Sequence, residues 1–247
     1  MKKIKVGAVS YLNTKPLLYG IEHSRELMQQ IELIKEYPSK IAKKLLDDEI
    51  DVGLVPVAVI PQMKEHYIIS DFCIGAEGNV ASVCLFSEVE MSKIEKVLLD
   101  YQSRTSVALC KLLFKHHWKK DVLFEDAKGD FAKEVEGTTA TVLIGDRALM
   151  QRGKSKFIYD LGGEWKAMTG LPFVFAAWIS NKKLPDEFIS LFNKKNSEGV
   201  NNIDVVVEEN VCAFYDLHTY YTKNISYVLN DEKRKGLDLF LKLLQQK

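Results

Sequence analysis

Apolar stretches of strand length alternate along the chain with stretches in which apolar residues recur at helical spacing. The first stretch, Ile4 to Val9, predicts a strand. Pro16 predicts the start of a helix, because proline has a helical backbone angle and lacks the N–H that a first turn leaves unpaired. Further strands are predicted at residues 31–37, 52–55, 96–100 and 141–144, and further helices at 38–46, 103–118 and 231–244. This alternation favours an α/β fold with mainly parallel strands.

Two continuous β-prone stretches, residues 80–86 and 173–179, flank the middle of the chain. The segment between them has predicted strands and a predicted helix of its own, as expected of a second small α/β unit. We therefore predict a discontinuous first domain, residues 1–86 and 178–247, and an inserted second domain, residues 87–177. The flanking stretches are the expected connections between the domains, and the active site is expected in the cleft between them.

Polar residues follow the first predicted strand at the point where it ends. Ser10, Tyr11 and Asn13 stand in the loop that leads to Pro16, and Pro56 follows the third strand in a second such loop. Because the carboxyl ends of parallel strands meet at one edge of a sheet, these residues are candidates for binding a small polar ligand. Asn13 also has an alternative interpretation, as a cap of the following helix.

The predicted second domain has a polar cluster of its own. Four small or cationic polar residues stand together at the start of its predicted helix: Ser103, Arg104, Thr105 and Ser106. Backbone N–H groups and hydroxyls at a helix start form an anion site, which is compatible with a second role as a helix cap. Arg104 either binds a ligand carboxylate directly or pairs with a neighbouring carboxylate such as Asp100 or Asp146.

Further candidates follow from where the predicted fold puts them. Ser82 lies on the first stretch between the domains, where it is either ordinary strand filling or a hydroxyl that faces the cleft. Gly145 and Asp146 follow a predicted strand, and Asp146 is either a helix cap or a catalytic group. Thr169 and Gly170 either form a plain turn or line the site just before the second stretch between the domains.

Charge and composition exclude several functions. The 247 residues contain 34 basic and 34 acidic side chains, so no broad attraction to nucleic acid or to an anionic membrane is expected. No apolar stretch approaches the roughly 20 residues that cross a bilayer, and no secretory signal is evident, so a cytoplasmic protein is expected. The 4 cysteines include no C-x-x-C pair, which favours reduced thiols and gives no support for a metal site.

Several segments carry a family resemblance, in this order along the chain: VSYLNTKPL, PSKIAKKLLDDEIDVGLVPV, GNVASVCLFS, LLDYQSRTSVALCKLL, VLIGDRAL, DLGGEWKAMTGLPFVFAAW and YYTKNISYVLNDEKRKGLDLF. As a set they resemble the menaquinone-biosynthetic chorismate dehydratases, the MqnA family. That family has the type II periplasmic-binding-protein fold, two lobes joined by two crossover strands, and the resemblance implies this fold here.

The resemblance also implies a reaction, the dehydration of chorismate to 3-[(1-carboxyvinyl)oxy]benzoate, which begins the futalosine route to menaquinone and uses no metal or organic cofactor. Such an enzyme orients a substrate with two carboxylates and stabilises charge that develops on the ring carboxylate. On this interpretation Asn13 and Ser82 are catalytic, and the other candidates named above bind the substrate. No partner besides this small molecule is expected, and monomer and homodimer both stay open.

The general base is not evident from the sequence. All 5 histidines lie outside the site motifs among the segments that carry the resemblance. One hypothesis is that the enolpyruvyl carboxylate of the substrate removes the ring proton, while Asn13 and serine hydroxyls position it. The competing hypothesis is that Asp51 or Glu77 is the base.

Two other functions stay open on the sequence alone. A solute-binding protein uses the same two lobes to hold a small anion without transforming it. A dihydroxynaphthoate synthase of the sister family acts on a later intermediate, although its first loop typically reads SPCPND where this chain reads SYLN.

Overall fold

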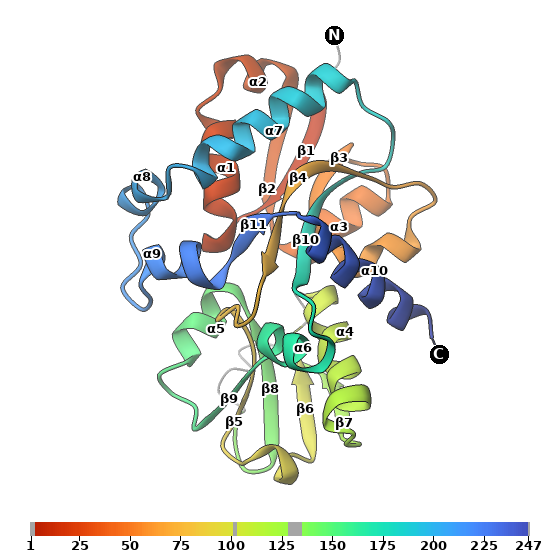
Figure 1. Cartoon of the computed structure of the whole chain (residues 1–247), viewed down its shortest axis with the longest axis vertical. Helices are drawn as coiled ribbons and strands as arrows, with labels where there is room; N and C mark the ends of the chain where they lie inside the picture. Colours follow the sequence, from red (N-terminus) through yellow and green to blue (C-terminus); the bar gives the residue numbers. More distant parts are fainter. Residues whose placement is uncertain (1–2, 101–102, 128–134, 247) are drawn as a thin grey trace.

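The computed structural model describes residues 3–100, 103–127 and 135–246, and it shows two lobes stacked along the long axis of the molecule (Figure 1). Each lobe is built on a mixed β-sheet with helices packed against it. The first sheet has the strand order β11-β4-β10-β3-β1-β2, and the second has the order β7-β6-β8-β5-β9. The predicted two-lobed α/β fold is confirmed.

The elements have the following bounds. The first sheet contains β1 (Ile4–Val9), β2 (Ile31–Glu36), β3 (Val52–Pro56), β4 (Tyr67–Ala76), β10 (Phe173–Ser180) and β11 (Ser226–Val228). The second contains β5 (Val83–Ser87), β6 (Lys96–Leu99), β7 (Leu123–Asp126), β8 (Thr139–Ile144) and β9 (Phe157–Asp160). The α-helices are α1 (Lys15–Glu22), α2 (Arg25–Gln30), α3 (Pro38–Leu46), α4 (Arg104–Leu113), α5 (Gly145–Gln151), α6 (Leu161–Thr169), α7 (Asp186–Val200), α8 (Ile203–Glu208), α9 (Leu217–Thr219) and α10 (Asp231–Gln245). Short 3-10 or π turns are η1 (Leu12–Thr14), η2 (Val57–Gln62), η3 (Met91–Lys93), η4 (Phe114–Trp118) and η6 (Tyr220–Asn224).

Strand direction differs from the prediction of mainly parallel sheets. β1 is parallel to β2 and β3, and β6 is parallel to β7 and β8. β10 is antiparallel to both β3 and β4, and β5 is antiparallel to both β8 and β9. The reason is that β5 and β10 enter their sheets from the other lobe, so they run away from the cleft while their neighbours run towards it.

The predicted domain boundaries also differ from the pairing of the strands. The stretch 80–86 was expected to pass between the domains, but β5 pairs entirely within the second sheet. The stretch 173–179 was expected to do the same, but β10 pairs entirely within the first sheet. The chain passes between the sheets at residues 77–82 and 170–172, and we propose that the lobes divide there.

Local sequence signals explain the elements that carry the site. α1 has Pro16 in its first turn, and α3 begins at Pro38 and buries one side through Ile41, Ala42 and Leu45. α7 lies beside α1 on one face of the first sheet (Figure 1). Within the described part of the chain, no helix has the length and apolar character that a membrane span requires.

Candidate active site

A cavity lies between the lobes, where the carboxyl ends of β1 and β3 face the first turns of α4 and α5. It encloses about 490 Å³ that no protein atom occupies, part of which is open to solvent. The predicted site residues that line it are Tyr11, Asn13, Pro56, Ser103, Thr105, Ser106 and Gly145. The two predicted polar clusters, one from each lobe, therefore meet at one cavity.

None of the described residues that line this cavity has a charged side chain. The polar lining groups are hydroxyls and one amide, supplied by Tyr11, Asn13 and Thr14 from the first lobe and by the start of α4 from the second. A carboxylate bound against these described residues would meet neutral donors and no lysine or arginine.

Asn13 lies in η1, between β1 and α1. The Thr14 hydroxyl donates to Asn13 Oδ1 over 3.2 Å, and the Tyr227 hydroxyl donates to the Asn13 carbonyl oxygen over 3.0 Å. These bonds orient Asn13 and leave its side-chain Nδ2 as a donor for a ligand in the cavity. The N-cap residue of α1 is Thr14, which makes no side-chain capping bond, so capping does not explain these polar residues.

Tyr11 reaches from the first lobe and packs on Gly145 of the second. A Cβ at Gly145 would lie 3.0 Å from the Tyr11 ring, and Gly145 has a φ of +59°, so a larger residue is strained there. Burial raises the pKa of Tyr11 well above its usual value; Arg147 opposes this shift and Asp100 adds to it. Tyr11 is therefore a neutral phenol at physiological pH.

The start of α4 combines a helix cap with residues that line the cavity. The Ser103 hydroxyl accepts from the Ser106 N–H over 3.1 Å, and the Thr105 hydroxyl accepts from the Ala58 N–H of the other lobe over 3.1 Å. The Ser106 hydroxyl lines the cavity and has no hydrogen bond within residues 3–100, 103–127 and 135–246. Helix geometry also leaves the N–H groups of Arg104 and Thr105 without intrahelical acceptors. A ligand carboxylate can use these donors.

Arg104 does not line the cavity, contrary to the prediction. Its Nη1 donates to Gln62 Oε1 over 3.2 Å, so it pairs with neither of the carboxylates considered above. Asp100 is fully buried and pairs instead with Arg147, whose Nη2 lies 2.7 Å from Asp100 Oδ2. We therefore remove Arg104 from the candidate ligand-binding residues.

Asp146 connects the lobes instead of capping a helix. Its Oδ1 accepts a hydrogen bond from the Leu12 N–H over 3.2 Å, in the loop that also contains Asn13. The N-cap residue of α5 is Ile144, which makes no capping bond. Burial raises the pKa of Asp146, while the hydrogen bond from Leu12 and the charge of Lys15 oppose that shift. Asp146 thus positions the loop that supplies Asn13.

Thr169 and Gly170 form the plain turn that was one of their two interpretations. The Thr169 hydroxyl donates to the Trp165 carbonyl oxygen over 2.8 Å and accepts from the Leu171 N–H over 3.1 Å. Gly170 ends α6 in the left-handed conformation, with a φ of +74°. Neither residue lines the cavity, so we remove both from the candidate site.

Ser10 and Ser82 also lie outside the cavity lining. Ser10 is exposed to solvent at the end of β1. Ser82 has no exposed surface, although the next residue, Val83, lines the cavity. We therefore remove Ser10 and Ser82 from the residues that line the candidate site.

The two acids considered as bases lie outside the cavity lining as well. Asp51 precedes β3, at the end of the strand away from the cavity, and accepts from the Lys5 N–H and from Lys182. Glu77 is paired with Lys233, whose Nζ lies 2.6 Å from Glu77 Oε1. Burial raises the pKa of Glu77, but the hydrogen bond and charge of Lys233 outweigh it and leave that pKa below its usual value. Neither acid is placed to remove a proton from a ligand in the cavity.

Three contacts at the site come from residues that the sequence analysis gave no role: Leu12, Arg147 and Tyr227. Leu12 acts through its backbone N–H, which no side-chain pattern reveals. Tyr227 lies in YYTKNISYVL, a segment that contributed to the family resemblance but has no signal of its own for a contact with Asn13.

A two-lobed fold with a ligand cavity between the lobes defines the class, which is that of periplasmic-binding-protein-like molecules. Solved structures of other proteins are similar to this chain in fold. A protein of Archaeoglobus fulgidus has a TM-score of 0.74 with 16% identity, covering 99% of this chain and 97% of that one. The alkanesulfonate-binding protein SsuA of Xanthomonas axonopodis pv. citri has a TM-score of 0.68 with 10% identity, covering 99% and 92%.

The family can be stated more narrowly from sequence. The model of a family described as menaquinone biosynthesis matches residues 4–246, so this chain belongs to that family. The chain is 26% identical to the chorismate dehydratase of Thermus thermophilus, covering 99% of this chain and 96% of that protein. It is 27% identical to the chorismate dehydratase of Campylobacter jejuni, covering 96% and 95%. The family resemblance noted above is confirmed.

Replacing Ser106 with alanine tests the anion site at the start of α4. Because a hydrogen bond to a charged group is worth about 1.5–3 kcal/mol, Ser106→Ala is expected to raise the KM for a carboxylate substrate by about tenfold or more. The control, Ser24→Ala, removes the cap of α2, which lies outside the cavity lining, and lowers the free energy of unfolding by about 1 kcal/mol. Steady-state kinetics and thermal melting separate the two effects. An unchanged KM for Ser106→Ala would show that α4 has only a structural role here.

Proposed function

We propose that this protein is a chorismate dehydratase, a hydro-lyase that converts chorismate to 3-[(1-carboxyvinyl)oxy]benzoate without a cofactor, in the futalosine route to menaquinone. The observation that carries the proposal is a cavity lined by neutral donors from both lobes, in a chain similar over nearly its full length to two chorismate dehydratases. The function of those relatives supports chorismate as the substrate, and the lining supports a small polar anion as ligand.

The proposed chemistry is a balanced elimination. A proton leaves the ring carbon that bears the enolpyruvyl ether, and the hydroxyl on the neighbouring carbon departs with a proton as water. The ring becomes aromatic, which supplies the driving force, so the protein mainly orients the substrate and stabilises charge that develops on the ring carboxylate.

The lining residues suit that task. The hydroxyl of Ser106 and the backbone N–H groups at the start of α4 are proposed to hold one substrate carboxylate. Asn13 Nδ2 and the neutral Tyr11 hydroxyl, on the opposite side of the cleft, are proposed to donate to oxygens that gain negative charge in the transition state.

We propose that the enolpyruvyl carboxylate of the substrate itself removes the ring proton. Among the described lining residues there is no carboxylate, histidine or lysine to do so. Asp51 and Glu77 are engaged in ion pairs with Lys182 and Lys233. If the base is part of the substrate, the protein needs none in the cavity. This explains why the described polar groups that line the cavity are all neutral.

The direct test is to incubate the purified protein with chorismate and to follow the mixture by chromatography and mass spectrometry. The expected result is a product that lacks the mass of one water molecule relative to chorismate. Chorismate that stays unchanged but bound would identify a solute-binding protein, to which the fold neighbours point. Chorismate that is neither bound nor changed would exclude both and leave the sister synthase family to be tested.

Single-turnover rates of Asp51→Asn and Glu77→Gln test the identity of the base. Because neither acid lines the cavity, both variants are expected to dehydrate chorismate within about threefold of the wild-type rate. Circular dichroism at the assay temperature serves as the control for folding, since Glu77 is paired with Lys233. A loss of several orders of magnitude at either acid would identify it as the base and refute proton removal by the substrate.

A further inference from the structure

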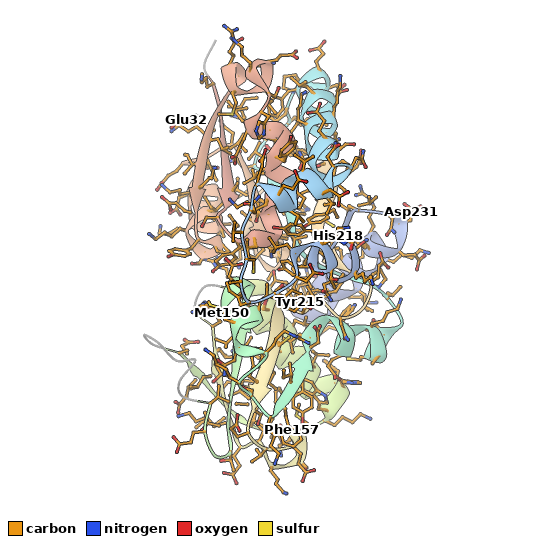
Figure 2. All side chains as sticks on the ribbon, turned by 90° about the vertical axis from the view of Figure 1, so that its left-hand side faces the viewer. Glu32, Met150, Phe157, Tyr215, His218 and Asp231 are labelled. Carbon is orange, nitrogen blue, oxygen red and sulfur yellow. The ribbon has the colours of Figure 1, made fainter. Side chains whose placement is uncertain are left out.

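The last helix, α10, lies at the level where the two lobes meet (Figure 1). Figure 2 shows its first residue, Asp231, between the levels of Glu32 in the first lobe and Phe157 in the second. Three buried residues of α10 recur at spacings of three and four, so they share one face of the helix: Lys233, Gly236 and Phe240. This face is the part of α10 that contacts both lobes.

Lys233 and Gly236 each contact one of the two connections between the sheets. Lys233 Nζ donates to Glu77 Oε1 over 2.6 Å, at the start of the first connection. Gly236 lies directly against the second connection, because a Cβ at this position would be only 2.1 Å from the Pro172 carbonyl oxygen. Glycine is therefore required for α10 to lie this close to the backbone of the connection.

Phe240 packs against both lobes one turn further along the helix. Its ring lies edge to face on Phe173, the first residue of β10, with centroids 4.9 Å apart, and on Trp165 of α6 at 6.1 Å. Phe173 in turn contacts Phe175 at 4.6 Å, and Phe175 lines the cavity. α10 also packs on α4, whose first turn lines the cavity from the second lobe. The helix thus contacts elements of both lobes that form the cavity wall.

The cleft itself is bridged by hydrogen bonds that require a defined angle between the lobes. The Leu12 N–H donates to Asp146 Oδ1 over 3.2 Å, and the Ala58 N–H donates to the Thr105 hydroxyl over 3.1 Å. Two lobes joined by two connections can rotate about them. Because α10 contacts both connections and both lobes, such a rotation would have to break its contacts.

We propose that Gly236 is a positioning residue, which allows α10 to fix the angle between the lobes. The loop with Tyr11 and Asn13 and the first turn of α4 line the cavity from different lobes, so their separation depends on this angle. A misplacement of about 1 Å can lower a rate by about 10²-fold. The consequence for turnover rests on the proposed function, whereas the consequence for the lobes does not.

The test is Gly236→Ala, because its added methyl group must push α10 away from Pro172. Spin labels at two exposed residues report the distance between the lobes: Glu32→Cys on β2 and Lys93→Cys on η3, in a Cys212→Ser background that removes the one cysteine that is not buried. Double electron–electron resonance on the protein alone is expected to give a shifted or broader distance distribution. We expect kcat/KM for chorismate to fall by about tenfold or more.

The matched control is Gly20→Ala, which creates the same kind of clash within one lobe. A Cβ at Gly20 would lie 2.2 Å from the Lys195 carbonyl oxygen, and the two helices involved, α1 and α7, both belong to the first lobe. This variant is expected to melt at a lower temperature but to keep the label distance, and to keep kcat/KM of the folded protein within about twofold.

Phe240→Leu is a second test that does not depend on how well Gly236→Ala folds. It keeps an apolar side chain and removes the aromatic contact with Trp165, so it is expected to broaden the label distances as well. Unchanged label distances in both variants, or an equal change in Gly20→Ala, would overturn the inference. A Gly236→Ala protein with shifted lobes and unchanged kcat/KM would overturn the positioning role. A wild-type protein that leaves chorismate unchanged would overturn the proposed function, whereas the label distances would still decide the role of α10.

Discussion

The Asn13→Ala variant is expected to fold as the wild type does and to dehydrate chorismate about a hundredfold more slowly or worse, with a smaller change in KM. Among the residues that the structure describes, none accepts from Asn13 Nδ2, since Thr14 and Tyr227 engage only the oxygens of this residue. A donor that tightens its bond as charge develops lowers the barrier more than it strengthens substrate binding. Stopped-flow or steady-state assays that resolve kcat from KM provide the measurement.

Two further variants sharpen this result. Asn13→Asp keeps the size of the side chain but places a negative charge beside a substrate with two carboxylates, so it is expected to bind chorismate more weakly than Asn13→Ala. Asn201→Ala is the control, because Asn201 is exposed and, within the described part of the chain, its side chain bonds only to the nearby Ser197. An Asn13→Ala enzyme with wild-type kcat would remove Asn13 from the chemistry.

Local patterns predicted the elements that position the site. The strand Ile4–Val9 is observed with the predicted bounds, α1 begins one residue before Pro16, and α3 begins at Pro38, because each signal acts within a few residues. The strand β4 was not predicted, since Ser70 and Asp71 interrupt its apolar pattern. These polar residues are satisfied by Asn193, which lies far away in the sequence.

Strand direction could not be predicted for a different reason. The sequences of β5 and β10 are as apolar as those of their neighbours, so they do not show from which end the chain enters each sheet. That depends on where the chain passes between the lobes, which is set by the packing of both sheets together. For the same reason the predicted boundaries at residues 86 and 178 differ from the division that we propose from the strand pairing.

For the candidate site too, local signals predicted some residues, whereas contacts that depend on the tertiary structure could not be predicted. Tyr11, Asn13 and Ser106 were predicted from loops at strand ends and helix starts, and all three line the cavity. Arg104 was chosen for its charge, but charge does not show which side of a helix start faces a ligand. The bond from the Leu12 N–H to Asp146 spans the two lobes, and contacts of this kind are fixed only by the tertiary structure.

Lys233 is the residue whose replacement is expected to cost the most stability. It lies in the first turn of α10 and has no exposed surface. Its Nζ donates to Glu77 Oε1 over 2.6 Å, to Ser226 Oγ over 2.7 Å and to the Val228 carbonyl oxygen over 2.8 Å. One buried ammonium thus ties α10 and β11 to residue 77, where the chain leaves the first sheet.

Lys233→Met keeps the length and apolar stem of the side chain and removes the charge. The acceptors that it leaves behind lose their donor, so we expect the free energy of unfolding to fall by about 3 kcal/mol. For a chain of this size that corresponds to a melting temperature lower by about 6–12 °C. Differential scanning calorimetry of the wild type and the variant at neutral pH provides the measurement.

The matched control is Lys235→Met on the same helix. Lys235 pairs with Glu232 over 2.6 Å, but its side chain is 64% exposed, so this variant is expected to leave the melting temperature nearly unchanged. Melting the wild type and Lys233→Met at low pH provides a second comparison, because Lys233 holds the pKa of Glu77 below its ordinary value of 4.5. The stability from that pair is present above pH 4.5 and is lost as the pH falls through the lowered pKa, so the gap between wild type and Lys233→Met is expected to narrow there. Equal melting temperatures for Lys233→Met and Lys235→Met at neutral pH would show that the cost of burying this ammonium cancels its hydrogen bonds.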